Sequence, residues 1–316
     1  MSTIFLATHA KSAGNIHFLA KDFALVLTSY SDGINHILCT NSSPDAKLLT
    51  ALYSNRAACN YELGNPDHSA SDCRSALGYD PLHLKSYYRL ARSLKTCDTE
   101  AGLAVFAAIS LSRGKPGKSL IQLYDSVRSS CISLQLPVKH QSITLLHPGE
   151  MGVYNALEKG RTAVCLAPGI YEDLIQFNSA GRLIICGLGS VTIKPAIKLT
   201  PRIMNTVNID EKATAYFSNI TFSGGKKNIS QAAVCVTGKA STVHGSRFED
   251  YEGAALCSAG SPLTVLKCVF TSLPHMAIEV REGGSLVADL VVATNCRKGI
   301  LVYGGATSCA ITNSML

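Results

Sequence analysis

The sequence predicts a two-domain protein, in which an all-α array of helix pairs (residues 1–136) precedes an all-β domain of repeated short strands (residues 137–316). Over residues 10–111 the apolar positions recur at helical spacing, and turn residues such as Gly64-Asn65-Pro66 interrupt them. In the second domain β-branched residues and glycine prevail, and apolar positions recur every 22 residues. A chain of 316 residues is long enough to bury a core in each domain.

The composition narrows the class of protein. Charged residues make up 16% of the chain and hydrophobic residues 47%, which excludes a disordered chain. No run approaches the roughly 18 apolar residues that a membrane helix needs, and the apolar run at residues 4–7 is too short for a secretory signal. The sequence therefore predicts a cytoplasmic protein without a membrane partner.

Cysteine spacing and charge distribution exclude two further kinds of site. The twelve cysteines are expected to be small buried residues, because proteins of the cytoplasm are kept reduced. No two have C-x-x-C spacing, so we predict neither a metal site nor a cofactor. The net charge of +7 is spread out, with 13 Lys and Arg against 10 Asp and Glu in residues 1–136 and 16 against 12 in the rest. Nucleic-acid binders concentrate basic residues in a patch, so no nucleic-acid partner is expected.

The helical domain is built from repeats. Residues 52–81 (LYSNRAACNYELGNPDHSASDCRSALGYDP) resemble the tetratricopeptide repeat, in which small residues let neighbouring helices approach and a proline closes the unit. Residues 11–34 and 85–111 fit the same template, which implies three repeats. Gly33 stands where the template has alanine and is expected to loosen the packing. A final amphipathic segment should cap the array over residues 118–134, with its apolar stripe at Leu120, Leu123, Val127, Cys131 and Leu134.

Five polar residues lie at helical spacing on the first helices of these repeats: Lys11, Asn15, Asn55, Lys85 and Arg89. The members of the first and last pairs are four residues apart and so share a helix face. First helices line the concave groove of such a superhelix. The set resembles the dicarboxylate clamp of tetratricopeptide co-chaperones, which implies binding of the C-terminal Glu-Glu-Val-Asp of the seventy- and ninety-kilodalton heat-shock chaperones. Each residue alone is typical of a solvated surface charge or a structural amide, but the five together favour the clamp.

The second domain combines short strands with glycine turns. Residues 152–193 resemble the entry of a right-handed parallel β-helix of the pectin-lyase-like type. In such a fold each turn stacks on the last at about 4.8 Å, so one column repeats one residue type. The 22-residue period predicts inward columns at Val234, Leu256, Ile278 and Ile300, at Val236, Ser258, Val280 and Val302, and at Phe248, Phe270 and Val292.

Strand alternation places the residues between the two aliphatic columns on the outward face: Cys235, Cys257, Glu279 and Leu301. Two exposed neighbouring thiols could form a disulfide or bind a metal. Tolerated small residues are the better interpretation of Cys235 and Cys257. If the two cysteines are interior instead, the assigned phase of the strands is wrong.

An enzymatic β-helix acting on acidic polysaccharides needs clustered carboxylates on one outward face. The candidates are His244-Gly245, Arg247, Glu249, Asp250, Glu252, Glu279 and Arg281. They complete no catalytic motif, so we assign no catalytic residue. The domain also resembles the β-helices of intracellular adaptors, including F-box proteins, in which the stack recognises other proteins.

The sequence thus predicts a non-enzymatic adaptor that binds a chaperone tail through Lys11, Asn15, Asn55, Lys85 and Arg89, while the β-helix binds a client protein or a carbohydrate. One alternative is a polysaccharide-active lyase or hydrolase carrying a helical targeting module. A third is a scaffold whose groove binds an internal peptide. No capping helix follows the last repeat before Leu316, so we expect either that the chain is truncated there or that a partner docks at that end.

Overall fold

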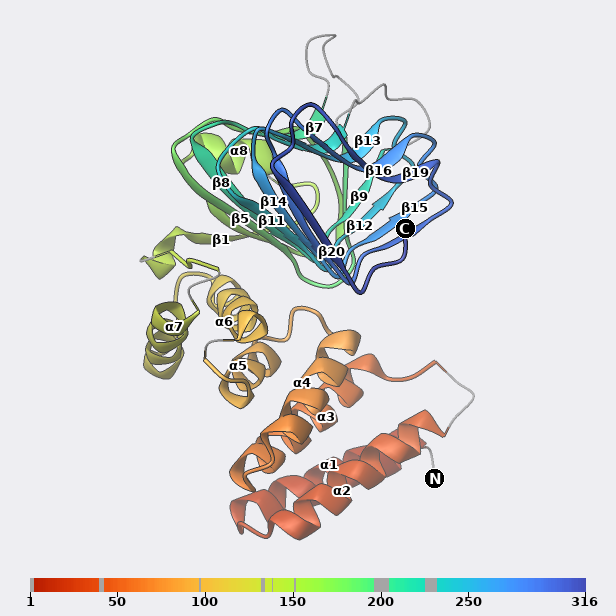
Figure 1. Cartoon of the computed structure of the whole chain (residues 1–316). Coiled ribbons are helices and arrows are strands. Elements are labelled where there is room, and N and C mark those ends of the chain that lie inside the picture. Colours follow the sequence, from red (N-terminus) through yellow and green to blue (C-terminus); the bar gives the residue numbers. More distant parts are fainter. Residues whose placement is uncertain are drawn as a thin grey trace. The chain divides into compact units, whose positions relative to one another are not determined.

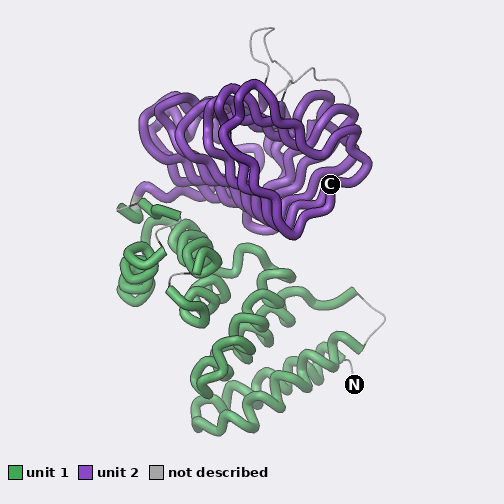
Figure 2. Tube along the Cα trace, viewed as in Figure 1, with its two compact units in different colours: residues 1–141 green, residues 142–316 purple. Residues whose placement is uncertain are grey.

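The computed structural model describes residues 3–39, 43–96, 98–131, 134–137, 139–150, 152–195, 205–224 and 232–316. The chain divides into two compact units, Met1–Gln141 and Ser142–Leu316, which Figure 2 shows in green and purple. None of the helices in the described ranges combines the length and the apolar character that a membrane crossing requires.

The first unit is a tetratricopeptide superhelix, as predicted. In its described residues seven helices follow one another, and each packs against the next (Figure 1). They are α1 (Thr3–Leu19), α2 (Phe23–Leu38), α3 (Ala46–Glu62), α4 (Pro66–Tyr79), α5 (Leu84–Ser93), α6 (Thr99–Leu111) and α7 (Lys118–Ser130). The first six form three helix pairs and α7 closes the array. Helix α1 begins eight residues before the predicted repeat does.

Local chemistry fixes where these helices begin. The carboxylates of Asp22, Asp45 and Asp98 each accept a hydrogen bond from a backbone N–H in the first turn of α2, α3 and α6. Such an N-cap contributes about 1 kcal/mol to the free energy of unfolding. Helix α4 instead begins with Pro66, whose fixed φ suits the first helical position and whose missing N–H needs no partner there.

Two glycines bring the first three helices into close contact. A Cβ on Gly14 of α1 would lie 2.5 Å from Cε1 of Tyr30 on α2. A Cβ on Gly33 would lie 3.0 Å from a methyl group of Leu52 on α3. The expectation that Gly33 loosens the packing is therefore wrong, because Leu52 fills the space that an alanine methyl would take.

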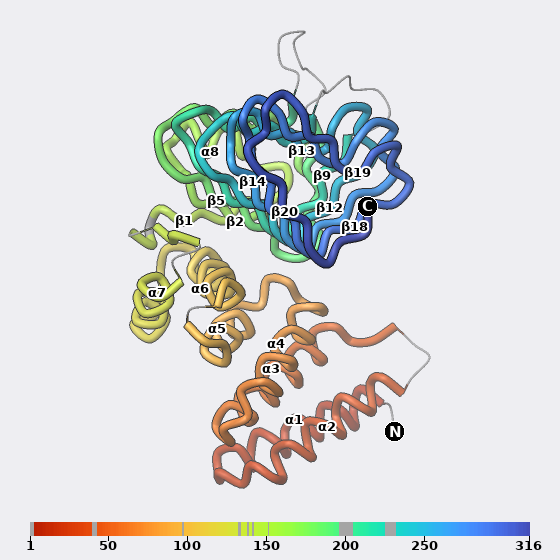
Figure 3. Tube along the Cα trace, in the orientation of Figure 1, coloured from red at the N-terminus to blue at the C-terminus, as the bar shows by residue number. Residues whose placement is uncertain are grey.

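The second unit is a parallel β-helix of three sheets, as predicted, and Figure 3 shows its turns stacked in sequence order from green to blue. Sheet A, in spatial order, consists of β1 (Ile143–Leu146), β2 (Ala163–Leu166), β5 (Gly181–Gly187), β8 (Ala213–Ser218), β11 (Ser241–His244), β14 (Pro262–Leu266), β17 (Ser285–Asp289) and β20 (Ser308–Thr312). Sheet B consists of β3 (Gly169–Asp173), β6 (Val191–Pro195), β9 (Thr221–Ser223), β12 (Arg247–Glu249), β15 (Val269–Thr271) and β18 (Val292–Thr294). Sheet C consists of β4 (Ile175–Phe177), β7 (Asn205–Ile209), β10 (Ala232–Val236), β13 (Ala254–Ala259), β16 (Met276–Arg281) and β19 (Lys298–Val302).

A short helix, α8 (Val153–Glu158), precedes β2 and is held by one buried carboxylate. Asp173 accepts hydrogen bonds from the backbone N–H groups of Val153 and Tyr154 in its first turn, and from that of Leu174 at 2.9 Å. Burial raises the pKa of Asp173, although these backbone hydrogen bonds act in the opposite direction. The carboxylate thus joins α8 to the end of β3.

The predicted aliphatic columns are confirmed by the strand register. Val234, Leu256, Ile278 and Ile300 are successive partners in sheet C, and so are Val236, Ser258, Val280 and Val302. The first column lies in or against the core of the stack.

The aromatic column differs from its prediction in its last member. Phe222, Phe248 and Phe270 are successive partners in sheet B, with ring centroids 5.0 and 4.9 Å apart. The partner of Phe270 is Ala293, whereas Val292 was predicted. The cause is one additional residue in the turn between β16 and β17: three residues lie between Ser258 and Pro262, and four lie between their partners Val280 and Ser285.

The predicted exposure of two cysteines is wrong, although their phase is right. Cys235 and Cys257 point away from the core of the stack, yet they are only 9% and 3% exposed. They group with Ala232 in a small apolar cluster of their own. A cysteine side chain is short, so longer neighbouring side chains can shield it from solvent. Glu279 and Arg281 on the next strand are longer and lie near enough to both thiols to act on them electrostatically.

Candidate peptide-binding site

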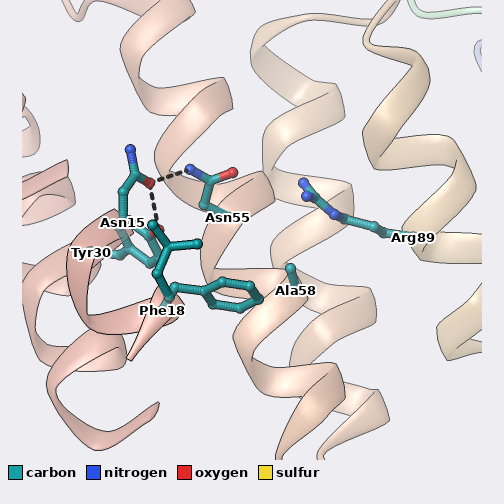
Figure 4. A pocket seen from close by; sticks show the side chains of 7 residues that line it. Asn15, Phe18, Tyr30, Asn55, Ala58 and Arg89 are labelled. Carbon is teal, nitrogen blue, oxygen red and sulfur yellow. Dashed lines mark hydrogen bonds between the residues drawn. The ribbon is translucent and has the colours of Figure 1, made fainter. Parts of the chain in front are cut away.

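The first helices of the three repeats, together with α2, surround a pocket of about 250 Å³. Helix α1 supplies Asn15, Phe18 and Leu19, α2 supplies Tyr30, α3 supplies Asn55 and Ala58, and α5 supplies Arg89 (Figure 4). Three of the five residues predicted from the sequence, Asn15, Asn55 and Arg89, therefore meet at one place. They come from three different repeats, as the spacing implied.

The two asparagines are connected by a hydrogen bond. The Oδ1 atom of Asn15 accepts from Nδ2 of Asn55 at 3.2 Å and from the hydroxyl of Tyr30 at 2.8 Å. Because the carbonyl of Asn15 is engaged in this way, its amide nitrogen is directed away from Asn55 and Tyr30 (Figure 4). That nitrogen can donate to an anionic ligand.

Arg89 extends toward Asn55 from the third repeat (Figure 4). Its Nη1 donates to the backbone carbonyl of Ser54 at 2.8 Å and to the Ser54 hydroxyl at 2.5 Å. Burial lowers the pKa of Arg89, but an arginine remains charged at neutral pH. Ser54 thereby holds the guanidinium beside the pocket, with further N–H donors for a carboxylate.

The two lysines predicted from the sequence lie on the same helices as pocket residues, but they are not among the residues that line the pocket. Lys11 lies one turn before Asn15 on α1, and Lys85 lies one turn before Arg89 on α5. Lys85 is exposed and Lys11 is half-buried. Charges at such positions act through a region of high dielectric, where they can attract an anion without fixing its geometry.

Tyr30 is the residue of the site that the sequence analysis missed. It lies on a second helix rather than a first one, and it has the sequence character of a core aromatic. Its ring packs against Gly14, and its hydroxyl reaches Asn15. Burial raises the pKa of Tyr30, so the hydroxyl stays protonated and remains a donor. The signal in the sequence that could have indicated it was Gly14, which lies next to Asn15 on the groove-lining helix and leaves room for a large side chain.

The pocket is apolar on one side. Phe18 contacts Phe23 edge to face at a centroid distance of 5.8 Å, and Leu19 is 84% exposed at the end of α1. A smaller hollow of about 30 Å³ adjoins the pocket and shares Ala58 and Arg89 with it. There the guanidinium of Arg92 lies 4.2 Å from the ring centroid of Tyr61. The groove thus offers amide and guanidinium donors beside an apolar wall.

In the β-helix the residues considered for catalysis are distributed over all three sheets. His244 ends β11 of sheet A, Arg247 and Glu249 lie on β12 of sheet B, and Glu279 and Arg281 lie on β16 of sheet C. Asp250 and Glu252 follow β12 in the turn that leads to sheet C. The described strands therefore do not gather the seven candidates on a single face.

A wide hollow of about 770 Å³ lies beside α8 in the second unit. Its lining includes the carboxylates of Glu150 and Glu172 and the exposed side chains of Tyr154 and Ile170. An aromatic ring beside carboxylates can contact a carbohydrate or a peptide equally well.

Comparison with known proteins relates the helical unit to co-chaperones. Tetratricopeptide repeat protein 4 of Mus musculus is 38% identical over 79 residues, which are 25% of this chain and 19% of that protein. The Hsp70/Hsp90 co-chaperone CNS1 of Saccharomyces cerevisiae is 35% identical over 88 residues, 28% of this chain and 22% of that protein. The chain thus spans about a fifth of the length of these relatives.

Among solved structures, the pectin methylesterase of Aspergillus niger is 14% identical, with a TM-score of 0.30 over 57% of this chain and 77% of that one. No protein-family profile matches the chain. The helical unit is a tetratricopeptide-repeat domain related to those of co-chaperones, and a parallel β-helix follows it.

Proposed function

We propose that this protein is an adaptor whose helical unit binds the free carboxyl end of an acidic chaperone tail. The observation that carries the proposal is the convergence of Asn15, Asn55 and Arg89 from three repeats on one pocket. Lys11 and Lys85, one turn away, complete the five-residue clamp by attracting the anion.

The pocket suits an aspartate that ends a chain. Such a residue presents two carboxylates a few ångströms apart, and the amide of Asn15 and the guanidinium of Arg89 supply donors from opposite sides. The apolar wall of Phe18, Leu19 and Ala58 suits an aliphatic residue just before it. A sequence ending in Val-Asp meets both requirements. The relationship to CNS1, named a co-chaperone of Hsp70 and Hsp90, supports this class of partner.

We propose further that the β-helix binds its ligand, a client protein or a carbohydrate, without transforming it. The separation of His244, Arg247, Glu249, Glu279 and Arg281 over three sheets supports this, because polysaccharide cleavage needs paired carboxylates on one face. The adaptor would then hold a chaperone on one unit and a client on the other.

Fluorescence polarisation with a labelled peptide ending in Glu-Glu-Val-Asp tests the clamp. The free acid should bind, and Arg89→Ala should weaken binding about 10- to 100-fold, since hydrogen bonds to charged groups contribute about 1.5–3 kcal/mol. Lys47→Ala, which removes an exposed charge from α3 at a distance from the pocket lining, is the matched control and should change little. Equal binding of the free and the C-terminally amidated peptide would contradict the proposal and favour recognition of an internal peptide.

A further inference from the structure

The two buried cysteines of sheet C form a chemically distinct pair. Cys235 on β10 and Cys257 on β13 are register partners on adjacent parallel strands, and both side chains lie on the same outer face of the sheet. Neighbouring strands are about 4.8 Å apart, which lies within the Cα separations of about 4.4–6.8 Å that disulfides span. The separation of the two strands is therefore compatible with a disulfide between these cysteines without a large backbone movement.

Charged groups of the next two strands surround this pair. Arg281 and Glu279 lie on β16, Glu282 follows them, and Tyr303 follows β19. The Tyr303 hydroxyl donates to Glu279 at 2.5 Å and also interacts with Arg281, so this carboxylate is engaged by a neighbour. Arg281, whose Nε lies 3.8 Å from a carboxylate oxygen of Glu282, is the cation close to both sulfurs.

The two thiols differ in acidity. A hydrogen bond from the Cys257 thiol, with a further contribution from the charge of Arg281, lowers the pKa of Cys235 against the effect of burial and of Glu279 and Glu282. The same hydrogen bond, together with burial, raises the pKa of Cys257. A thiolate beside a cation and a second thiol is the arrangement that favours oxidation by peroxide.

A second cysteine pair in the same unit provides an internal comparison. Cys165 on β2 and Cys186 on β5 are also register partners, and both are buried. Their spacing is equivalent, but burial raises the pKa of Cys186 to about 12. Strand geometry is thus shared by the two pairs, and the charged side chains of Arg281 and Glu279 beside Cys235 and Cys257 are what distinguishes the first pair.

We propose that Cys235 and Cys257 are a peroxide-oxidised thiol pair that closes reversibly to a disulfide between two turns of the β-helix. This modification is independent of the peptide-binding pocket, which lies in the other unit. The exposed fractions of 9% and 3% admit a small oxidant such as hydrogen peroxide more readily than a bulky alkylating reagent.

The reaction has two steps. The Cys235 thiolate attacks one oxygen of the peroxide, so that an S–O bond forms, the O–O bond breaks, and the departing hydroxide takes up a proton to become water. The Cys257 sulfur then attacks the sulfenic sulfur of Cys235, so that the S–S bond forms and the S–O bond breaks. The hydroxide leaves with the Cys257 proton as a second water. Two thiols lose two electrons and the peroxide gains them.

Peptide mapping of the full chain after treatment with hydrogen peroxide tests the proposal without any substitution. The peptides that contain Cys235 and Cys257 should be found joined, and dithiothreitol should separate them, while Cys165 and Cys186 stay reduced. Cys39 and Cys309 are exposed, so oxidation of their thiols serves as the positive control for the peroxide treatment. Failure of the joined peptide to appear once these thiols are oxidised would overturn the proposal, as would joining of Cys165 to Cys186 at the same rate.

Two substitutions separate the roles of the cysteines. Cys257→Ser should stop at the sulfenic acid on Cys235, which dimedone traps, whereas Cys235→Ser should give no adduct at position 257. Arg281→Ala should slow disulfide formation severalfold, since it removes the cation beside the thiolate. Cys186→Ser is the matched control and should leave the rate unchanged. Adduct formation on Cys257 in the Cys235→Ser variant would reverse the assignment and contradict the mechanism.

Discussion

Tyr30 determines how Asn15 is presented to a ligand. Its hydroxyl and the amide of Asn55 both donate to the carbonyl of Asn15, which turns the Asn15 nitrogen away from them. The repeat template predicted Asn15, Asn55 and Arg89 because their helical spacing carries the signal. The template could not predict Tyr30, because it assigns groove residues only to the first helix of each repeat. Tyr30 lies on a second helix, and its sequence context is that of a buried core aromatic.

Tyr30→Phe should therefore weaken binding of the Glu-Glu-Val-Asp peptide about 3- to 10-fold, because one neutral hydrogen bond contributes about 0.5–1.5 kcal/mol. The ring still packs on Gly14, so the midpoint of thermal unfolding should hardly change. Isothermal titration calorimetry measures the first quantity and circular dichroism the second. Unchanged affinity would mean that Asn15 is oriented by Asn55 alone.

Gly14 has no side chain, and the ring of Tyr30 occupies the space that a Cβ atom would take. Gly14→Ala places a methyl group 2.5 Å from Cε1 of Tyr30, so α1 or the ring must shift. Such overpacking costs about 1–3 kcal/mol of the free energy of unfolding, and peptide affinity should fall with it.

The matched control for this change is Gly78→Ala in α4, where a Cβ meets nothing within 4 Å. It should stabilise its helix by about 0.5–1 kcal/mol. Urea denaturation compares the two variants, and equal effects would contradict the packing argument.

At the scale of elements, the 22-residue period predicted which columns face the core but not where the period fails. The additional residue in the turn after β16 shifts the partners of β17 and β18 by one, so that Phe270 meets Ala293, whereas β19 keeps the 22-residue spacing to β16. Gly238, Gly260 and Gly304 fit a 22-residue series of turn glycines, and Gly283 lies one residue past that series, which is the trace of this insertion in the sequence. The burial of Cys235 and Cys257 could not be predicted either. Strand alternation predicts which side of a sheet a side chain points to, but not whether neighbouring side chains cover it there.

The stacked phenylalanines should contribute most to the stability of sheet B. Phe248→Ala removes a fully buried ring from between Phe222 and Phe270 and should cost about 3–5 kcal/mol. Val292→Ala, at a half-buried position outside the column, should cost much less. Hydrogen exchange of peptides from β12 and β15 reports the difference, and comparable losses in both variants would place Val292 in the column after all.

At the scale of the whole molecule, each unit has its own core and its own kind of repeat. A ligand that binds only the helical unit stabilises only that unit, by about 2.7 kcal/mol at a concentration of 100 Kd. Differential scanning calorimetry with the Glu-Glu-Val-Asp peptide should therefore move one of two transitions upward. A single transition that moves as a whole would show that the units unfold together.

The contact between Arg89 and Ser54 has a consequence for how binding responds to damage. Asn15, Asn55 and Arg89 come from successive repeats, and Arg89 is held in place by the backbone of the repeat before it. Fraying of either outer repeat would dismantle the pocket while the rest of the array stayed folded. The proposed peptide binding would therefore depend on three folded repeats at once, and a bound chaperone tail would stabilise the array against unfolding from either end.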